Sequence, residues 1–413
     1  MSARIFFMDG TYTLMRIPLD LYGVFLQPIL RVLIPQTQSL HLDRNSTLGG
    51  PLEGISPDYQ HGFMNVSVTH LECSIVCHTS WARAVFEPII QSLPPQKAKT
   101  ISSCTEPYIV LSVISTELDA ANRVLELTSP LAAAGIPIFF ITSFYSDFIV
   151  APARERPNVI DALNERGFEL FDDKASFFGS RKNSLSNPQQ RQMQLRLLGA
   201  SRRKTPPPFS NEYLQSGTFD LLRKRGITPY VAPDLEVIAC SARDAAAFVD
   251  AYARITCVVG REIYPAAIDR ENWIERVETK FYLAIVSLLL SQPRFASVTL
   301  ARDDPPSLLL DKNLLHLFGN SAVGDMDAIL IPIFLDLVSL PTEVTGIVCV
   351  VSGRLVQELK MKATSELSYL STARAGVVML PKQQAIKALE ILRPLMEPQV
   401  QELDRKEKGW RRK

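Results

Sequence analysis

Acidic, histidine and cysteine side chains are the groups in this chain that could carry out catalysis or hold a metal ion. Asp172-Asp173 and Asp303-Asp304 are paired carboxylates, a residue type used in general acid and base catalysis. Both pairs fall at expected turns, and turn formation explains them better. The sequence has no Walker-type phosphate loop, no GxGxxG after a strand and no GxSxG motif, and its five histidines are scattered. We therefore expect a binding or regulatory protein, not an enzyme, and no cofactor.

Four potential metal ligands, His70, Cys73, Cys77 and His78, lie close together in the sequence. Their spacing differs from the paired spacings of recognised zinc sites, and they straddle an expected hairpin. We therefore favour ordinary strand residues over a metal site. The six cysteines fall mostly within apolar runs, which indicates buried reduced thiols and a cytoplasmic protein.

Composition narrows the class of partner. The chain has 413 residues, 46% of them hydrophobic and 21% charged, and a net charge of +1. This near-neutral balance favours a globular protein of two to four domains and argues against nucleic-acid binding. The longest apolar run, Tyr282 to Leu290, is about half the length of a membrane span, and the start lacks the pattern of a secretory leader.

Apolar periodicity divides the chain into four similar segments. The clearest, 106–173, has strand, helix, two strands, helix and strand in the order βαββαβ, the ferredoxin-like unit. The run Ile141-Thr142-Ser143 to Pro152 also lines up with Leu370-Ser371-Thr372 to Pro381 at one constant offset, which indicates an internal duplication. We predict an α+β fold of four ferredoxin-like units in two tandem halves. The predicted boundaries are 11–92, 106–173, 230–320 and 326–396 for the units, 174–213 for a disordered linker and 397–413 for a charged tail.

The predicted linker contains two conceivable phosphorylation sites. Arg181 stands three residues before Ser184, and Thr205 precedes a proline, as some kinases require. Phosphorylation there would add charge that could dock the linker or recruit a partner. A solvated tether is the favoured alternative, because the segment has too little apolar surface to order itself.

A family resemblance appears around the second segment. The run LTSPLAAAGIPIFFITSFYSDFIVAP, with the strand YIVLSVI before it and the helix NVIDALNERG after it, resembles the ACT domain. In particular it resembles the second ACT unit of the CASTOR family, cytosolic arginine sensors upstream of the TOR complex. The order of the four units and the N-terminal run IPLDLYGVFLQPILRVLIP are also similar. The long inserts indicate a fungal or otherwise divergent relative of that family.

The resemblance implies that an amino acid binds in a cleft between the second and fourth units. Backbone groups near a strand start and a helix N-terminus would hold its carboxylate and ammonium groups. Transferred by motif, the implied ligand-binding residues are Pro137, Ile138, Thr345, Gly346, Ile347, Thr372, Ala373 and Gly376.

The chain departs from the family at the arginine pocket. The family has a serine at the position of Pro137, aromatic residues at those of Ala373 and Ala375, and an aspartate for the guanidinium at that of Gly376. A buried guanidinium without a partner costs several kcal/mol. Glu343 is the only nearby acid that could substitute, and Arg374 would oppose a cation. We therefore expect a neutral or smaller amino acid, or no ligand, in place of arginine.

The resemblance also implies a protein partner. Phe144, Tyr145 and Asp147 occupy the turn that in the family contacts the GATOR subcomplex, although a tight strand turn also favours Ser and Asp. Occupancy would be signalled to a TOR-regulating complex. Two alternatives stay open, a scaffold whose pocket has decayed and a regulatory subunit of an amino-acid biosynthetic enzyme. Because ACT sheets pair edge to edge, a homodimer is a further expectation.

Overall fold

The computed structural model describes most of the chain in nine stretches. They are residues 3–33, 62–104, 106–115, 122–171, 212–242, 279–301, 304–341, 343–361 and 366–397. The predicted linker lies outside them except for its last two residues, and the predicted tail lies outside except for Glu397. Ser184 and Thr205 therefore lie outside the described residues as well, and their phosphorylation stays a prediction.

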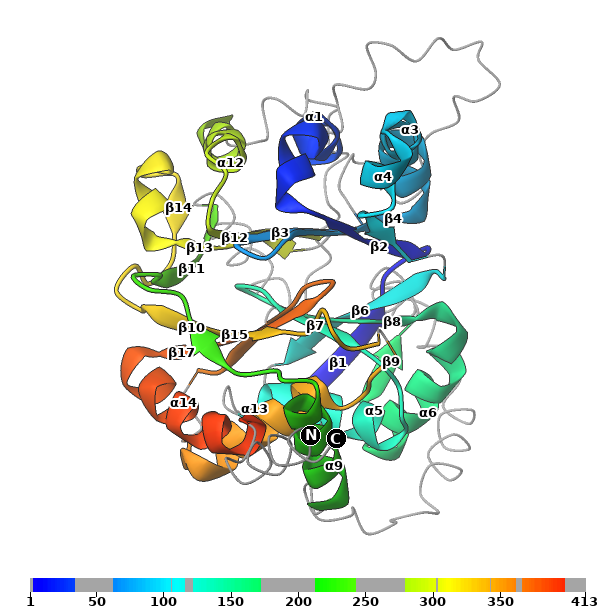
Figure 1. Ribbon diagram of the computed structural model, residues 1–413, viewed down its shortest axis with the longest axis vertical. Helices are drawn as coiled ribbons and strands as arrows, with labels where there is room; N and C mark the ends of the chain where they lie inside the picture. Colours follow the sequence, from blue (N-terminus) through cyan, green and yellow to red (C-terminus); the bar gives the residue numbers. More distant parts are fainter. Residues whose placement is uncertain are drawn as a thin grey trace, which may run out of the picture.

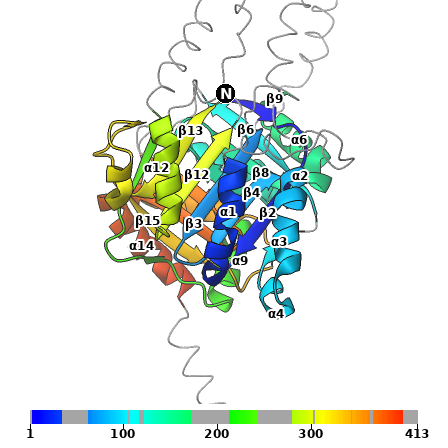
Figure 2. The same ribbon diagram turned by 90° about the horizontal axis from the view of Figure 1, so that it is seen from above.

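Two antiparallel sheets stack face to face, with helices on both outer faces (Figure 1). The upper sheet has the strand order β2 (Tyr12–Ile17), β4 (Cys73–His78), β3 (Phe63–Thr69), β12 (Phe295–Ala301), β13 (Asp304–Asp311) and β11 (Val237–Ala242). The helices above it are α1 (Tyr22–Leu33), α3 (Glu87–Ser92) and α12 (Thr279–Leu290), with the short α2 (Thr79–Trp81) and α4 (Pro95–Ala98). Seen from above, α1 and α12 lie side by side, and Tyr22 Oη donates to the Leu289 carbonyl at 2.8 Å (Figure 2).

The lower sheet carries the segments that resemble the ACT domain most. Its strand order is β6 (Tyr108–Ser115), β8 (Asp147–Pro152), β7 (Phe139–Thr142), β16 (Ser368–Ser371), β17 (Ala375–Pro381) and β15 (Leu330–Asp336). The helices below it are α5 (Arg123–Ala133), α6 (Arg156–Glu165), α9 (Glu212–Lys224), α13 (Ile347–Glu358) and α14 (Lys382–Met396). Short strands at the margins are β1 (Ala3–Phe7), β5 (Ser102–Ser103), β9 (Glu169–Phe171), β10 (Tyr230–Val231) and β14 (Ala322–Val323).

The two sheets join at both edges and close on each other. Tyr12 of β2 pairs with Tyr108 of β6, and Val237 of β11 pairs with Leu330 of β15. Within the described residues, twelve antiparallel strands thus form one closed barrel, and five further strands extend it. Aromatic side chains such as Phe63 and Phe148, whose ring centroids are 4.6 Å apart, fill the space between the sheets. Separate apolar cores lie between each sheet and its helices.

The prediction of four separate ferredoxin-like units is wrong. Strand β3 pairs with β12 over seven residue pairs, and β7 pairs with β16, so the predicted units share one hydrogen-bonded sheet. The physical reason is that an edge strand leaves a row of backbone N–H and C=O groups unpaired, and here strands from the other half of the same chain satisfy them. The closed barrel is mostly sheet, with its helices confined to the two outer faces.

The internal duplication has a structural counterpart at the centre of the lower sheet. Ile141 pairs with Leu370, the residue that the sequence offset makes its equivalent. On either side, the Phe140 amide donates to Ser371 Oγ at 2.9 Å and the Tyr369 amide donates to Thr142 Oγ1 at 3.0 Å. The offset makes Phe140 equivalent to Tyr369 and Thr142 equivalent to Ser371, so the second bond repeats the first with the two regions exchanged. A local twofold axis therefore relates the β7 and β16 regions. Within the described ranges, no helix is both long and apolar enough to cross a membrane.

Candidate functional site

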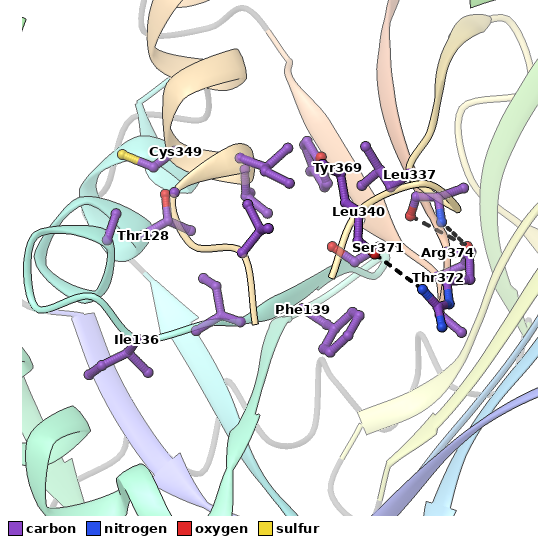
Figure 3. Close-up of a pocket in the computed structure, with 18 of the residues that line it drawn as sticks. Thr128, Ile136, Phe139, Leu337, Leu340, Cys349, Tyr369, Ser371, Thr372 and Arg374 are labelled. Atoms are coloured by element: carbon purple, nitrogen blue, oxygen red, sulfur yellow. Dashed lines mark hydrogen bonds between the residues drawn. The ribbon is translucent and has the colours of Figure 1, made fainter. Parts of the chain in front are cut away.

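A pocket of about 70 Å³ opens below the lower sheet, where the β7 and β16 regions meet (Figure 3). Helix α5 packs against α13 beside it. One wall comes from α5 and the start of β7, and the other comes from α13, the loop before it and the β16–β17 turn. The first wall is lined by Thr128, Ala132, Ile136, Ile138 and Phe139. The second is lined by Leu337, Leu340, Pro341, Val344, Gly346, Ile347, Val348, Cys349, Tyr369, Ser371, Thr372, Ala373, Arg374 and Ala375.

The N-terminus of α13 brings backbone donors to the pocket. Gly346 has a φ of 82°, a left-handed conformation that glycine adopts without a side-chain clash. The first bond of the helix runs from the Val350 amide to the Gly346 carbonyl at 2.8 Å. The amides of Ile347, Val348 and Cys349 precede that bond, so the helix offers them no acceptor. Such an end, with its positive dipole, favours a carboxylate.

The β16–β17 turn is held from the upper sheet. Glu72, 1% exposed, accepts hydrogen bonds through Oε1 from Thr372 Oγ1 at 2.7 Å and from the Arg374 amide at 2.8 Å. Its Oε2 accepts from Arg16 Nε at 2.7 Å. Ser74 Oγ accepts from the Ala373 amide at 3.0 Å. One wall of the pocket therefore depends on two residues of the N-terminal region.

Charge at the pocket is positive. The Arg374 guanidinium lines it and donates through Nη1 to the Leu340 carbonyl at 3.2 Å. Among the described lining residues there is no aspartate or glutamate. Glu72 lies behind the turn, where its oxygens already accept from Arg16, Thr372 and the Arg374 amide. The pocket thus offers hydrogen-bond donors and no counter-charge for a cation.

Tyr369 occupies the space beside Gly376. A Cβ at Gly376 would lie 2.3 Å from Tyr369 Oη, so a side chain there would have to displace the tyrosine ring. Burial raises the pKa of the Tyr369 hydroxyl, which stays neutral. No hydrogen bond joins this hydroxyl to any described residue, and Tyr369 is 1% exposed. A buried hydroxyl without a partner at a pocket is a ready donor or acceptor for a ligand.

The sequence-predicted ligand residues separate into three groups. Ile138, Gly346, Ile347, Thr372 and Ala373 line the pocket. Two others, Pro137 and Glu343, line a neighbouring pocket of about 380 Å³, which shares Phe139, Ala373 and Arg374 with the first. The last two, Thr345 and Gly376, line neither of these pockets.

Glu343 does not replace the missing aspartate. Its side chain is 78% exposed and lies 3.9 Å from Arg154 Nη2, on the outer pocket. Sequence reasoning missed Tyr369, Ser371 and the apolar residues before α13. A single tyrosine or serine on a buried strand has no distinctive spacing, and it becomes a pocket residue only through the pairing of β7 with β16.

The predicted partner turn between β7 and β8 points to the upper sheet. The Phe144 amide donates to Ser307 Oγ of β13 at 2.7 Å, and Phe144 and Tyr145 are half-buried. Asp147 is 1% exposed and forms an ion pair with Arg123 of α5. Burial raises the pKa of the Asp147 carboxyl, and Arg123 and the Thr142 hydroxyl oppose that rise. A partner role for this turn stays a prediction, and the Asp147 carboxylate is not on the surface.

The His70–His78 cluster consists of separated strand and turn residues. Cys73 and Cys77 are buried on β4, and burial raises the pKa of the Cys77 thiol to about 12. His70 Nε2 instead lies 2.8 Å from Tyr230 Oη, and His78 Nδ1 lies 2.9 Å from Ser80 Oγ. In the part of the chain that the structure covers, no three histidine, cysteine or acidic residues group as metal ligands would.

Comparison with known proteins identifies one domain. Residues 103–165 match the ACT domain model. No curated protein matches the sequence. Among solved structures, a protein from Agobacterium tumefaciens is similar at 16% identity and a TM-score of 0.26, over 42% of this chain and 95% of that chain.

Two further similar structures are aspartate kinase proteins. Aspartate kinase from Synechocystis is 10% identical with a TM-score of 0.31, over 95% of this chain and 56% of that chain. The regulatory subunit of aspartate kinase from Thermus thermophilus, in a ligand-free form, is 14% identical with a TM-score of 0.25, over 39% of this chain and 95% of that chain. By the family match, the chain contains an ACT domain at residues 103–165, and that domain supplies the first wall of the pocket.

Proposed function

We propose that this protein is a non-enzymatic regulatory protein that binds a small, neutral amino acid between α5–β7 and α13. The observation that supports it most is the pocket itself. One wall belongs to the ACT domain, and the other presents the amides of Ile347, Val348 and Cys349, for which the helix offers no acceptor. ACT domains are typically regulatory amino-acid-binding domains, and a helix N-terminus is suited to an α-carboxylate.

Size and charge select the class of amino acid. A volume of about 70 Å³ is far below the roughly 300 Å³ at which pockets for drug-sized ligands begin. The ligand side chain would face apolar groups such as Ile136, Leu337 and Leu340. A cationic side chain would meet Arg374 and no carboxylate, which disfavours arginine. The Tyr369 hydroxyl and Arg374 remain available to polar groups of the ligand.

Signalling would follow from linkage. A ligand that contacts both walls stabilises the arrangement in which they are closed, and a partner that prefers another arrangement is released or recruited. The resemblance to CASTOR proteins favours a cytoplasmic role in nutrient sensing with a TOR-regulating complex as the partner. If the chain were instead the regulatory subunit of a biosynthetic enzyme, it would co-purify with a metabolic enzyme.

Calorimetric titration of the full chain with each of the twenty amino acids tests the proposal. We expect saturable binding of one or a few small neutral amino acids and none of arginine. Ala132→Leu should fill the pocket and weaken that binding at least tenfold. Ala133→Leu is the matched control, because Ala133 is exposed on the same helix. This variant should bind the amino acid as tightly as the wild type does.

Two results would contradict the proposal. Tight binding of arginine would overturn the inferred ligand class. Absence of heat and of any concentration-dependent thermal shift with all twenty amino acids would favour a scaffold whose pocket no longer binds a ligand.

A further inference from the structure

The local twofold axis gives the strand and turn residues of the pocket equivalents on the opposite side. The axis passes between Ile141 and Leu370, and the two amide-to-hydroxyl bonds that flank this pair exchange equivalent partners. The β7–β8 turn is then the equivalent of the β16–β17 turn, and α5 is the equivalent of α13. The amino-acid pocket therefore has a second, equivalent location beside α5, and what fills that location can be read from the structure.

The equivalent location contains an ion pair. By the sequence offset, Asp147 corresponds to Gly376. The offset does not extend to the helices, so Arg123 and Ile347 are matched by place, each as the first residue of its helix. A side chain at position 376 would point at Tyr369 and Leu337, both lining residues of the pocket. The Asp147 carboxylate occupies the corresponding position beside α5, where the Arg123 guanidinium contacts it.

This ion pair differs from an ordinary surface pair. Asp147 is 1% exposed, whereas the Arg123 side chain is 26% exposed and reaches the carboxylate from the helix end. The closest approach joins Arg123 Nε to Oδ2, and neither Nε nor Oδ1 has a hydrogen-bond partner among the described residues. A buried carboxylate in this state has capacity for a further donor, and it becomes strongly unfavourable once its cation is removed.

We propose that Asp147 is the centre of a second binding site, specific for a guanidinium group, which Arg123 of the same chain fills. The planar guanidinium suits a carboxylate because it can donate two parallel hydrogen bonds. At the α13 pocket Gly376 and Ile347 stand where this pair would be, and Tyr369 occupies the space beside Gly376. Each chain should therefore bind a single amino acid. That stoichiometry rests on the proposed function, but the guanidinium site itself does not.

Removal of the internal arginine tests the site. The full chain carrying Arg123→Ala should lose stability and regain it with millimolar methylguanidinium, as a saturable rise in Tm of about 2 °C. The wild type, in which Arg123 fills the site, should show no such rise. The double variant Arg123→Ala/Asp147→Asn should also show no rise in Tm, because the asparagine side chain at position 147 carries no charge.

The proposal is decided by the difference between the single and the double variant in their response to methylguanidinium. An equal response of the single and double variants to methylguanidinium would overturn the proposal. If Arg123→Ala fails to fold, Arg123→Gln offers a longer neutral side chain and the same comparison with Asp147→Asn. Methylguanidinium binding needs no amino acid at the α13 pocket, so a failed titration with amino acids would leave this test intact.

Discussion

The β7–β8 and β16–β17 turns are built alike but anchored differently. In the first, the Ser143 amide donates to the Ser146 carbonyl at 2.9 Å, and in the second the Thr372 amide donates to the Ala375 carbonyl at 2.8 Å. The hydroxyl of Ser143 or Thr372 also accepts a bond from the last amide of its turn, at 3.2 and 3.1 Å respectively. Locally, the two turns are copies.

Their contacts with the upper sheet are unequal. The β7–β8 turn gives one amide, that of Phe144, to Ser307. The β16–β17 turn gives the equivalent amide to Ser74, and Glu72 takes two more bonds from it. The turn with the stronger anchor is the one that lines the pocket. Duplication therefore preserved the hydrogen bonds within the two turns, while charged side chains distinguish the two locations. Glu72 fixes a wall of the α13 pocket, and the ion pair of Asp147 with Arg123 fills the equivalent location beside α5.

Transfer of the ion pair to the pocket should have the largest effect. In a Tyr369→Phe background, which removes the hydroxyl that lies 2.3 Å from a Cβ at Gly376, Gly376→Asp should cost about 4 kcal/mol because it buries an unpaired carboxylate. Addition of Ile347→Arg should recover about half of that loss and abolish amino-acid binding. Urea unfolding of the three variants measures the free energies. No recovery on adding the arginine would mean that the two locations are not equivalent.

Removal of the anchor should have an intermediate effect. Glu72→Ala removes the carboxylate that accepts from Thr372 Oγ1, the Arg374 amide and Arg16, and we expect a loss of about 3 kcal/mol in the free energy of unfolding. Amide hydrogen exchange should rise in the turn at Thr372–Ala375 and not in the turn at Ser143–Ser146. Equal exchange in both turns would show that Glu72 does not fix the pocket wall.

The two serine anchors give the smallest and most closely matched test. Ser74→Ala and Ser307→Ala each remove one hydroxyl acceptor from an amide, of Ala373 or Phe144, and each should cost about 1 kcal/mol in stability. Only Ser74→Ala should weaken amino-acid binding in calorimetry, because only its turn lines the pocket. Equal losses of affinity would attribute the effect to general stability.

Prediction from the sequence succeeded at the level of single elements. The apolar run after Gly135 predicts the buried strand that β7 provides. Apolar periodicity places the start of the helix after β15 at about Thr342, whereas α13 begins at Ile347, after a glycine with a positive φ. The constant offset between Ile141 and Leu370 predicts the duplication that the local twofold axis displays. These features depend on residues close together in the chain or on direct repetition of them.

The pocket was only partly predictable. Ile138, Gly346 and Ile347 follow from motif transfer, and all three line it. Tyr369 and Ser371 could not be identified, because their role depends on the register of β16 against β7. The fold class was wrong for a related reason: edge strands of predicted units carry no sequence signal that names their partner, and here the partner is the other half of the same chain.

By itself, the sequence determined many of the strands, the duplicated turns and the absence of an acid at position 376. Periodicity, capping and turn preferences act over a few residues, so they can be read along the chain. Tertiary structure alone decided that the strands close into one barrel. It alone decided that Glu72 accepts a hydrogen bond from the amide of Arg374, 302 residues away in the sequence. It also decided that Arg123 meets Asp147. Long-range hydrogen bonds and ion pairs depend on register and burial, which no local pattern encodes.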